Sequence, residues 1–266
     1  MNQLIRYVDS LGMGQTVYNS AGTVIKAAVL LFFILYRNKY RIPLWKTLVT
    51  AAVVILGTPC IISGLAWIDN GFENFEGGNI LRAFTYFPLL LLLIAKLLKV
   101  PAGTMMDYAT PSIMIWHIIG QSVCPFLGCC SGIPCSWGIW NPAYDEMVFP
   151  TQWLICLTVL AVMIYIMHYE KRHDYDGSGK AYPIMLVIYG PLRFLLEFLK
   201  QGEKVFLGIS GLGIHALLMT LVGTVWLFTL EEIKRENNRK AERNRQSRRI
   251  YSPQRASTGY PKEDKV

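Results

Sequence analysis

The sequence has few charged residues for its length. Asp, Glu, Lys and Arg make up 17% of its 266 residues, whereas hydrophobic residues make up 53%. A large water-soluble domain needs more polar surface than this, so that class is excluded. The first 20 residues lack a continuous apolar run behind a basic start, and we therefore expect no cleavable signal peptide. No internal repeat of fixed period is visible, which disfavours a transporter built from repeated halves.

The sequence does contain seven separable apolar stretches, each near the length of roughly 20 residues that crosses a bilayer as a helix. They predict an all-α, polytopic integral membrane protein with about seven transmembrane helices. The predicted spans are 21–36, 47–67, 80–96, 108–127, 152–168, 182–199 and 207–230.

Basic residues are spread unevenly over the segments between these spans. Twenty of the 26 Lys and Arg lie on alternate loops or in the C-terminal tail, which the positive-inside rule assigns to the cytoplasm. This pattern predicts an N-out, C-in membrane domain over 1–230, with 69–78, 129–149 and 201–206 outside. The tail, 231–266, should start as a helix, end disordered and contact anionic lipid rather than nucleic acid.

Two charged residues lie in the predicted sixth span, where a charge at mid-depth costs about 2.5–3.5 kcal/mol on insertion scales. Arg193 and Glu197 are four residues apart, so they share one helix face with Tyr189. Pro191 should kink this helix, and Gly190 should let another backbone come close.

Two interpretations of this pair are open. It could simply hold two helices together, or Arg193 could bind a phosphate with its planar fork of donors while Glu197 orients that fork. We favour the second interpretation, and the natural phosphate within a bilayer is a phospholipid headgroup.

A second polar group lies near the end of the predicted fourth span. His117 and Gln121 are one helical turn apart, and Gly120, Gly128 and Gly132 allow an irregular backbone that could line a cavity. Alternatively, His117 is a core histidine that forms a hydrogen bond with a neighbouring helix.

Four of the six cysteines lie within twelve residues, at Cys124, Cys129, Cys130 and Cys135. Their spacing matches no common zinc pattern, so we predict no metal site. A disulfide is permitted on the outer side but not implied, and small packing residues are the favoured interpretation.

The order and spacing of several pieces resemble the prolipoprotein diacylglyceryl transferase family. In chain order they are Gly77-Gly78, then Asp107, Pro111 and Gly120, then Gly128 to Gly132, then Phe149 to Gln152, and then Tyr189-Gly190 with Arg193 and Glu197. The resemblance implies a seven-span enzyme of the bacterial plasma membrane whose active site faces the outer leaflet. It also implies transfer of the diacylglyceryl group from phosphatidylglycerol to the lipobox cysteine thiol of a secreted prolipoprotein, with no cofactor.

The chain lacks three motifs of that family. Gly-Arg-x-Gly is replaced by Gly120-Gln121-Ser122-Val123, His-Gly-Gly has no counterpart, and Met-Gly-Gln is replaced near Gly213-Ile214-His215. Arg82 falls at or beside the missing histidine and could restore a positive charge, while His117 or His215 supplies a base. Alternatively, the chain is a paralogue acting on another acceptor, or a non-enzymatic lipid or small-molecule binding or transport protein.

We therefore predict one lipid-accessible cavity in the outer half of the bilayer. The predicted catalytic residues are Arg193, Glu197, Arg82 and His117, and the predicted substrate-binding residues are Tyr189, Gln121, Gln152, Gly120 and Gly190. Lys200 and Lys204 are expected to lie at the membrane interface, and such a position at the outer end of the third span is also the alternative interpretation of Arg82.

Overall fold

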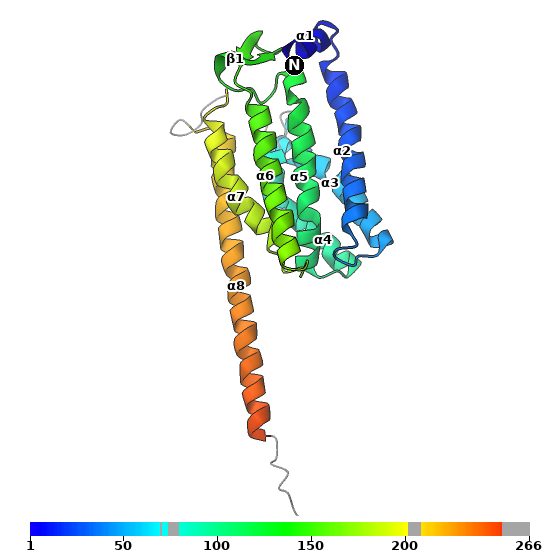
Figure 1. Ribbon diagram of the computed structural model, residues 1–266, viewed down its shortest axis with the longest axis vertical. Helices are drawn as coiled ribbons and strands as arrows, with labels where there is room; N and C mark the ends of the chain where they lie inside the picture. The colour runs from blue at the N-terminus through cyan, green and yellow to red at the C-terminus, as the bar shows by residue number, and fades with distance from the viewer. Residues whose placement is uncertain (70, 74–79, 202–208, 252–266) are drawn as a thin grey trace, which may run out of the picture. The chain divides into compact units, whose positions relative to one another are not determined.

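The computed structural model describes residues 1–69, 71–73, 80–201 and 209–251. The predicted positions Gly77-Gly78 and Lys204 lie outside these residues. Most of the chain is helical (Figure 1). The helices are α1 (Asn2–Ser10), α2 (Gly14–Tyr36), α3 (Leu44–Asp69), α4 (Ile80–Leu98), α5 (Ala102–Leu127), α6 (Thr151–Arg172), α7 (Ala181–Glu197) and α8 (Gly211–Tyr251).

Five helices in the described part of the chain are long and apolar enough to cross a membrane. They cover Gly14–Tyr36, Leu44–Ile68, Ile80–Leu98, Thr151–Arg172 and Gly211–Ser247. The prediction of a polytopic membrane protein is therefore confirmed. The other two predicted spans fall on α5, which has several buried polar residues, and on α7, which has only 17 residues.

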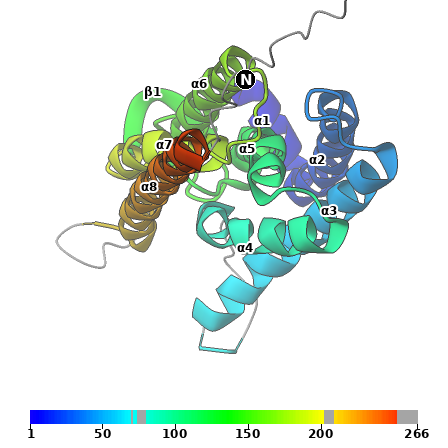
Figure 2. The same cartoon turned by 90° about the horizontal axis from the view of Figure 1, so that it is seen from below.

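Helix α5 lies at the centre of the bundle, where it contacts α2, α4, α6 and α7 (Figure 2). Its neighbours cover it so well that Tyr108 and Ala109 are fully buried, as are Phe33 of α2 and Phe84 of α4. Asp107 near its start accepts hydrogen bonds from the backbone nitrogens of Gly179 and Ala181, each at 2.8 Å. A carboxylate at the start of α7 satisfies amides that the helix itself leaves unpaired.

A small antiparallel sheet of β1 (Pro134–Asn141) and β2 (Glu146–Val148) follows α5. The all-α prediction therefore needs correction, because we treated 129–149 as a loop. Helix α1, also not predicted, is tied to this sheet: the Asn2 side chain donates to the Gly138 carbonyl and accepts from the Trp140 amide. Ile5 packs with Ile139 and Val148. Such short elements are stabilised by tertiary contacts, and they are too short to show a clear hydrophobic periodicity in the sequence.

The chain divides into two compact units, Met1–Leu227 and a second unit that begins at Phe228. Helix α8 continues through this boundary, and its residues from Glu231 to Ser247 are mostly charged and are all exposed.

Glu170, near the end of α6, is a buried carboxylate that the sequence analysis did not single out. It accepts hydrogen bonds from the phenols of Tyr36 and of Tyr40, the latter at 2.5 Å. Both phenols are buried within the bundle, so Glu170 joins α6 to the end of α2 and the turn after it.

We expect Glu170→Ala to lower the unfolding temperature of the detergent-purified protein. Each phenol that loses its acceptor should cost roughly 1–3 kcal/mol. Glu170→Gln keeps an acceptor oxygen and should recover most of this loss. The control is Glu236→Ala, which changes an exposed glutamate of α8. Equal unfolding temperatures for Glu170→Ala and the control would contradict this role.

Candidate functional site

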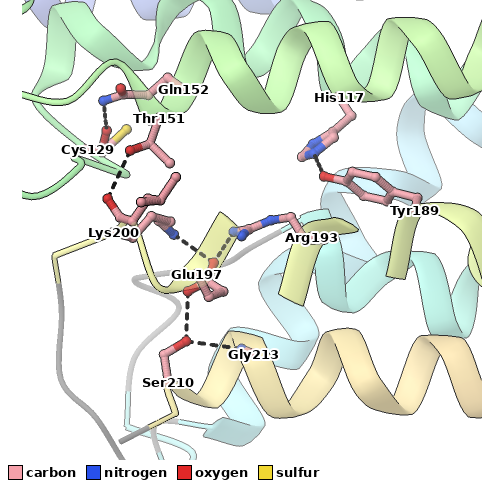
Figure 3. Close-up of polar contacts among 11 residues, drawn as sticks. His117, Cys129, Thr151, Gln152, Tyr189, Arg193, Glu197, Lys200, Ser210 and Gly213 are labelled. Atoms are coloured by element: carbon pink, nitrogen blue, oxygen red, sulfur yellow. Dashed lines mark hydrogen bonds and ion pairs between the residues drawn. The ribbon is translucent and has the colours of Figure 1, made fainter. Parts of the chain in front are cut away.

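The end of α7 carries a buried network of charges (Figure 3). Arg193 is 1% exposed and forms an ion pair with Glu197 one helical turn later. Glu197 also accepts hydrogen bonds from Lys200 Nζ at 3.2 Å and from Ser210 Oγ at 2.7 Å. Ser210 Oγ in turn accepts from the Gly213 amide at the start of α8. Glu197 thus fixes two cations and connects α7 to the start of α8.

Lys200 is not the surface residue that its predicted interfacial position implied. The residue is 7% exposed, and its ammonium group lies against Glu197 rather than at a surface. Burial of two cations beside one carboxylate leaves this region with an excess positive charge, which favours binding of an anion.

Arg193 has donors that its ion pair does not use. Among the residues that the structure describes, its buried Nε and Nη1 atoms have no hydrogen-bond partner. An unpaired buried donor costs roughly 1–3 kcal/mol, and more when it carries charge, so such atoms are rare without a reason. A bound anion would satisfy both nitrogens.

His117 of α5 shares a hydrogen bond with Tyr189 of α7, with 2.7 Å between Nε2 and the phenol oxygen. The imidazole is 1% exposed and meets the Phe84 ring edge-on. Nε2 thus forms the hydrogen bond to a neighbouring helix that is expected of a core histidine. Nδ1, in contrast, has no partner within the described residues. Tyr189 precedes Arg193 by one helical turn, so His117 is linked to the face of α7 that carries the arginine.

Two buried glutamines are also partly unpaired. Gln152 Nε2 donates to the Cys129 carbonyl at 2.9 Å, but its Oε1 has no described partner, and neither has Oε1 of Gln121. Unpaired polar atoms are therefore present on α5, α6 and α7. Sites for polar ligands commonly have such atoms, since the ligand completes their hydrogen bonds.

Pieces that are distant in sequence meet beside this network. The Ile133 amide donates to the Leu199 carbonyl at 3.0 Å, and Thr151 Oγ1 donates to the same carbonyl at 3.2 Å. The backbone N–H of Gln201 donates to the Ser131 carbonyl. These bonds hold the segment after α5 and the start of α6 against the end of α7.

A cavity of about 460 Å³ lies next to His117. Of the predicted site residues, His117, Gly120 and Gln121 line it, whereas Tyr189, Arg193, Glu197 and Gln152 are buried nearby but are not in its described lining. The full lining is Tyr18, Gly22, Ile25, Lys26, Pro59, Ile62, Ile80, Trp116, His117, Gly120, Gln121, Val123, Cys124, Cys129 and Cys130.

Lys26 and Tyr18 of α2 are lining residues that the sequence analysis missed. The signal for Lys26 was available, because it is a charged residue inside a predicted span and the same criterion singled out Arg193. Tyr18 precedes the predicted span and gave no such signal.

Arg82 lies in a different cavity from His117. This second cavity, of about 410 Å³, is lined by Arg82, Tyr86 and His215 together with apolar residues and Gly211. His215 Nε2 lies 2.9 Å from Thr85 Oγ1. The structure therefore groups Arg82 with His215, and not with His117.

Gly190 packs against α8 instead of lining the first cavity. A Cβ atom there would lie 2.9 Å from the Ala216 carbonyl oxygen, so the close backbone approach inferred from the sequence is present. At Gly120, by contrast, a Cβ atom would meet nothing within 4 Å, which agrees with its place at the cavity wall.

Three cysteines gather at the end of α5. The Sγ atoms of Cys124, Cys129 and Cys130 all lie within 4.8 Å of one another, and all three residues line the 460 Å³ cavity. Hydrogen bonds from Cys124 and then from Cys129 lower the pKa of the Cys130 thiol well below its usual value, against the effect of burial. The positive charges of Lys200 and Arg193 act in the same direction.

Comparison with known proteins places this chain in a family. Residues 71–229 match the family described as prolipoprotein diacylglyceryl transferase. A phosphatidylglycerol–prolipoprotein diacylglyceryl transferase from Dehalococcoides mccartyi is 22% identical over 209 residues, covering 71% of this chain and 80% of the relative. Phosphatidylglycerol–prolipoprotein diacylglyceryl transferase 2 from Clostridium perfringens is 24% identical over 136 residues. The match covers 48% of this chain and 52% of that relative.

No solved structure matches the chain. The family match covers more than half of the sequence and contains α4 to α7 with their charged and glycine-rich pieces. This multi-pass membrane protein therefore belongs to the prolipoprotein diacylglyceryl transferase family.

Proposed function

We propose that this chain is a phospholipid-dependent transferase that moves the diacylglyceryl group of phosphatidylglycerol to the lipobox cysteine thiol of a prolipoprotein. The names of its relatives give phosphatidylglycerol, prolipoprotein and transfer of a diacylglyceryl group, and the chain belongs to their family. The observation that carries the proposal is Arg193, a buried guanidinium held by Glu197 whose Nε and Nη1 have no partner in the described chain.

In the proposed reaction the acceptor thiolate attacks a glyceryl carbon. A carbon–sulfur bond forms, the carbon–oxygen bond to phosphate breaks, and glycerol phosphate leaves. Arg193 would hold the phosphate with its two open donors while Glu197 occupies Nη2. Charge-assisted bonds of this kind stabilise the negative charge that grows on the leaving phosphate oxygen.

The thiol proton needs an acceptor, and His117 is the proposed base. With the proton on Nε2, the ring donates to Tyr189 and leaves a lone pair on Nδ1. A neutral imidazole with one open nitrogen can act as a general base toward a thiol that comes within hydrogen-bond distance. Its place in the wall of the 460 Å³ cavity would let a substrate thiol approach.

We also propose that α5 and α7 cross the membrane, giving seven spans over 1–230 with the N-terminus outside, and that 231–266 is a cytoplasmic tail. Helices α5 and α7 pack with the apolar helices of the bundle. The network at Glu197 lies beside the segment 131–133, which the loop charges assign to the outside. This arrangement would place the site at the outer leaflet of a bacterial plasma membrane.

A non-enzymatic lipid-binding protein, or a paralogue with another acceptor, is the second candidate. The observation that favours it is the position of Arg82. This arginine lies with His215 in the 410 Å³ cavity and is not in the described lining of the cavity that contains Gln121, so its position does not support a role in place of the family arginine. Phosphate binding would then depend on Arg193 without that second guanidinium.

Arg193→Ala should reduce glycerol phosphate release by about 10²–10³-fold, since removing one donor to a developing oxyanion has an effect of this size. The variant should still accumulate in the membrane, because Lys200 remains to pair with Glu197. Arg235→Ala, on the exposed part of α8, is the matched control. Turnover of the Arg193 variant at the control rate would remove the proposed headgroup site.

The reaction itself is tested by mass spectrometry of a lipobox peptide incubated with the purified protein and phosphatidylglycerol. We expect a diacylglyceryl adduct on the cysteine and none on a peptide with serine at that position. If an active family enzyme forms the adduct in parallel and this protein does not, the transferase proposal is wrong and the binding alternative stands.

The topology is tested with fusions to the C-terminus. A green fluorescent protein should fluoresce there, and alkaline phosphatase should be inactive, because the tail is proposed to stay in the cytoplasm. An active phosphatase with a dark fluorescent fusion would reverse the orientation and move the site to the inner leaflet.

A further inference from the structure

The cysteine cluster at the end of α5 is formed by a sharp change in backbone direction. Gly128 ends the helix with a φ of 68°, and Cys130 also has a positive φ of 56°. The chain therefore turns back, so that Cys129 and Cys130 lie beside Cys124 of the last helical turns. Cys129 Sγ contacts the Cys124 carbonyl at 3.7 Å. All three thiols are free.

We propose that Cys124, Cys129 and Cys130 form a binding site for one thiophilic metal ion, with chemistry suited to Cu⁺ and, less tightly, to Zn²⁺. Soft thiolate ligands select such ions. With metal–sulfur bonds of about 2.3 Å, three sulfurs around one ion are about 4 Å apart. The three Sγ atoms already lie within 4.8 Å of one another, so small side-chain rotations would complete the site.

The position of the cluster offers an ion access, and a histidine outside the cluster lines the same cavity. All three cysteines line the 460 Å³ cavity, which gives a route to the sulfurs. His117 lines the same cavity, is 99% buried, and has an Nδ1 atom without a partner in the described chain. Imidazole nitrogen and thiolate are the usual ligands of zinc, whereas three thiolates alone suit Cu⁺.

The charges around the cluster fit an anionic metal–thiolate centre. Three thiolates with one Cu⁺ carry a net charge of −2, which would be costly to bury alone. Lys200 and Arg193 lie close enough to act electrostatically on Cys130. Both cations also pair with Glu197, so together they would offset part of the charge of the centre. Each thiol that binds as thiolate releases one proton, so the balance requires no oxidant or reductant.

The spacing alone does not indicate this site. The pattern Cys-x4-Cys-Cys differs from the paired Cys-x2–4-Cys spacing of common zinc sites, and it predicted no metal. The left-handed turn at Gly128 and Cys130 brings together thiols that a continuous helix would have separated. This inference does not depend on the proposed transferase activity.

The test is a titration of the full-length, detergent-purified protein with Cu⁺ or Zn²⁺ under anaerobic, reducing conditions, against a chromogenic chelator. We expect one ion per chain, with Cu⁺ bound more tightly. The variant Cys124→Ser/Cys129→Ser/Cys130→Ser should lose this binding. The matched control, Cys60→Ser/Cys135→Ser/Cys156→Ser, removes as many thiols outside the cluster and should keep it.

If the first variant does not fold, Cys129→Ser serves in its place, because this side chain is exposed and its replacement should be tolerated. Its affinity for Cu⁺ should fall at least about tenfold, because losing even a residue that only orients a ligand typically costs about 10–100-fold in metal affinity. Equal binding by the cluster variant and the control would overturn the proposal. So would a protein that binds neither ion while retaining three reduced thiols in the cluster.

Discussion

The ion pair between Arg193 and Glu197 is the interaction on which the rest of the site depends. A guanidinium in a bundle of apolar helices needs a counter-charge, since removing one partner of a buried pair typically costs 3–5 kcal/mol. Glu197 supplies that charge and is itself held by Lys200 and Ser210. The end of α7 is thereby held in place, and two arginine donors have no partner among the residues that the structure describes. A fixed guanidinium needs little rearrangement to bind a phosphate, which is the basis of electrostatic preorganisation.

Hydrogen bonds near this pair connect the end of α7 to the segment after α5 and to the start of α6. The backbone N–H of Ile133 and the Thr151 hydroxyl donate to the Leu199 carbonyl just after α7, and the backbone N–H of Gln201 donates to the Ser131 carbonyl in the segment following α5. The glycine-rich turn at Gly128 belongs to the same region, and it positions both the cavity wall and the three thiols. The proposed headgroup site and the proposed metal site are therefore neighbours, and both are influenced by the charges of Arg193 and Lys200.

Much of the fold could be predicted because a bilayer imposes a simple rule on sequence. Each predicted span coincides wholly or largely with a helix in the described chain, since backbone groups in lipid must be satisfied within the helix. The same rule identified Arg193 and Glu197, as charges are rarely tolerated there without a partner. It did not identify Glu170, which is near the end of its helix, or the sheet of β1 and β2, whose short strands have no strong period.

The sequence by itself determined the helical membrane class, the family and the pairing of Arg193 with Glu197. These follow from hydropathy, from motif order and from a separation of four residues on one helix. Only the tertiary structure decided that Arg82 lies with His215, that Lys200 is buried, and that three cysteines converge. Those outcomes depend on how separate helices and turns approach one another, and no local spacing in the chain encodes such distances.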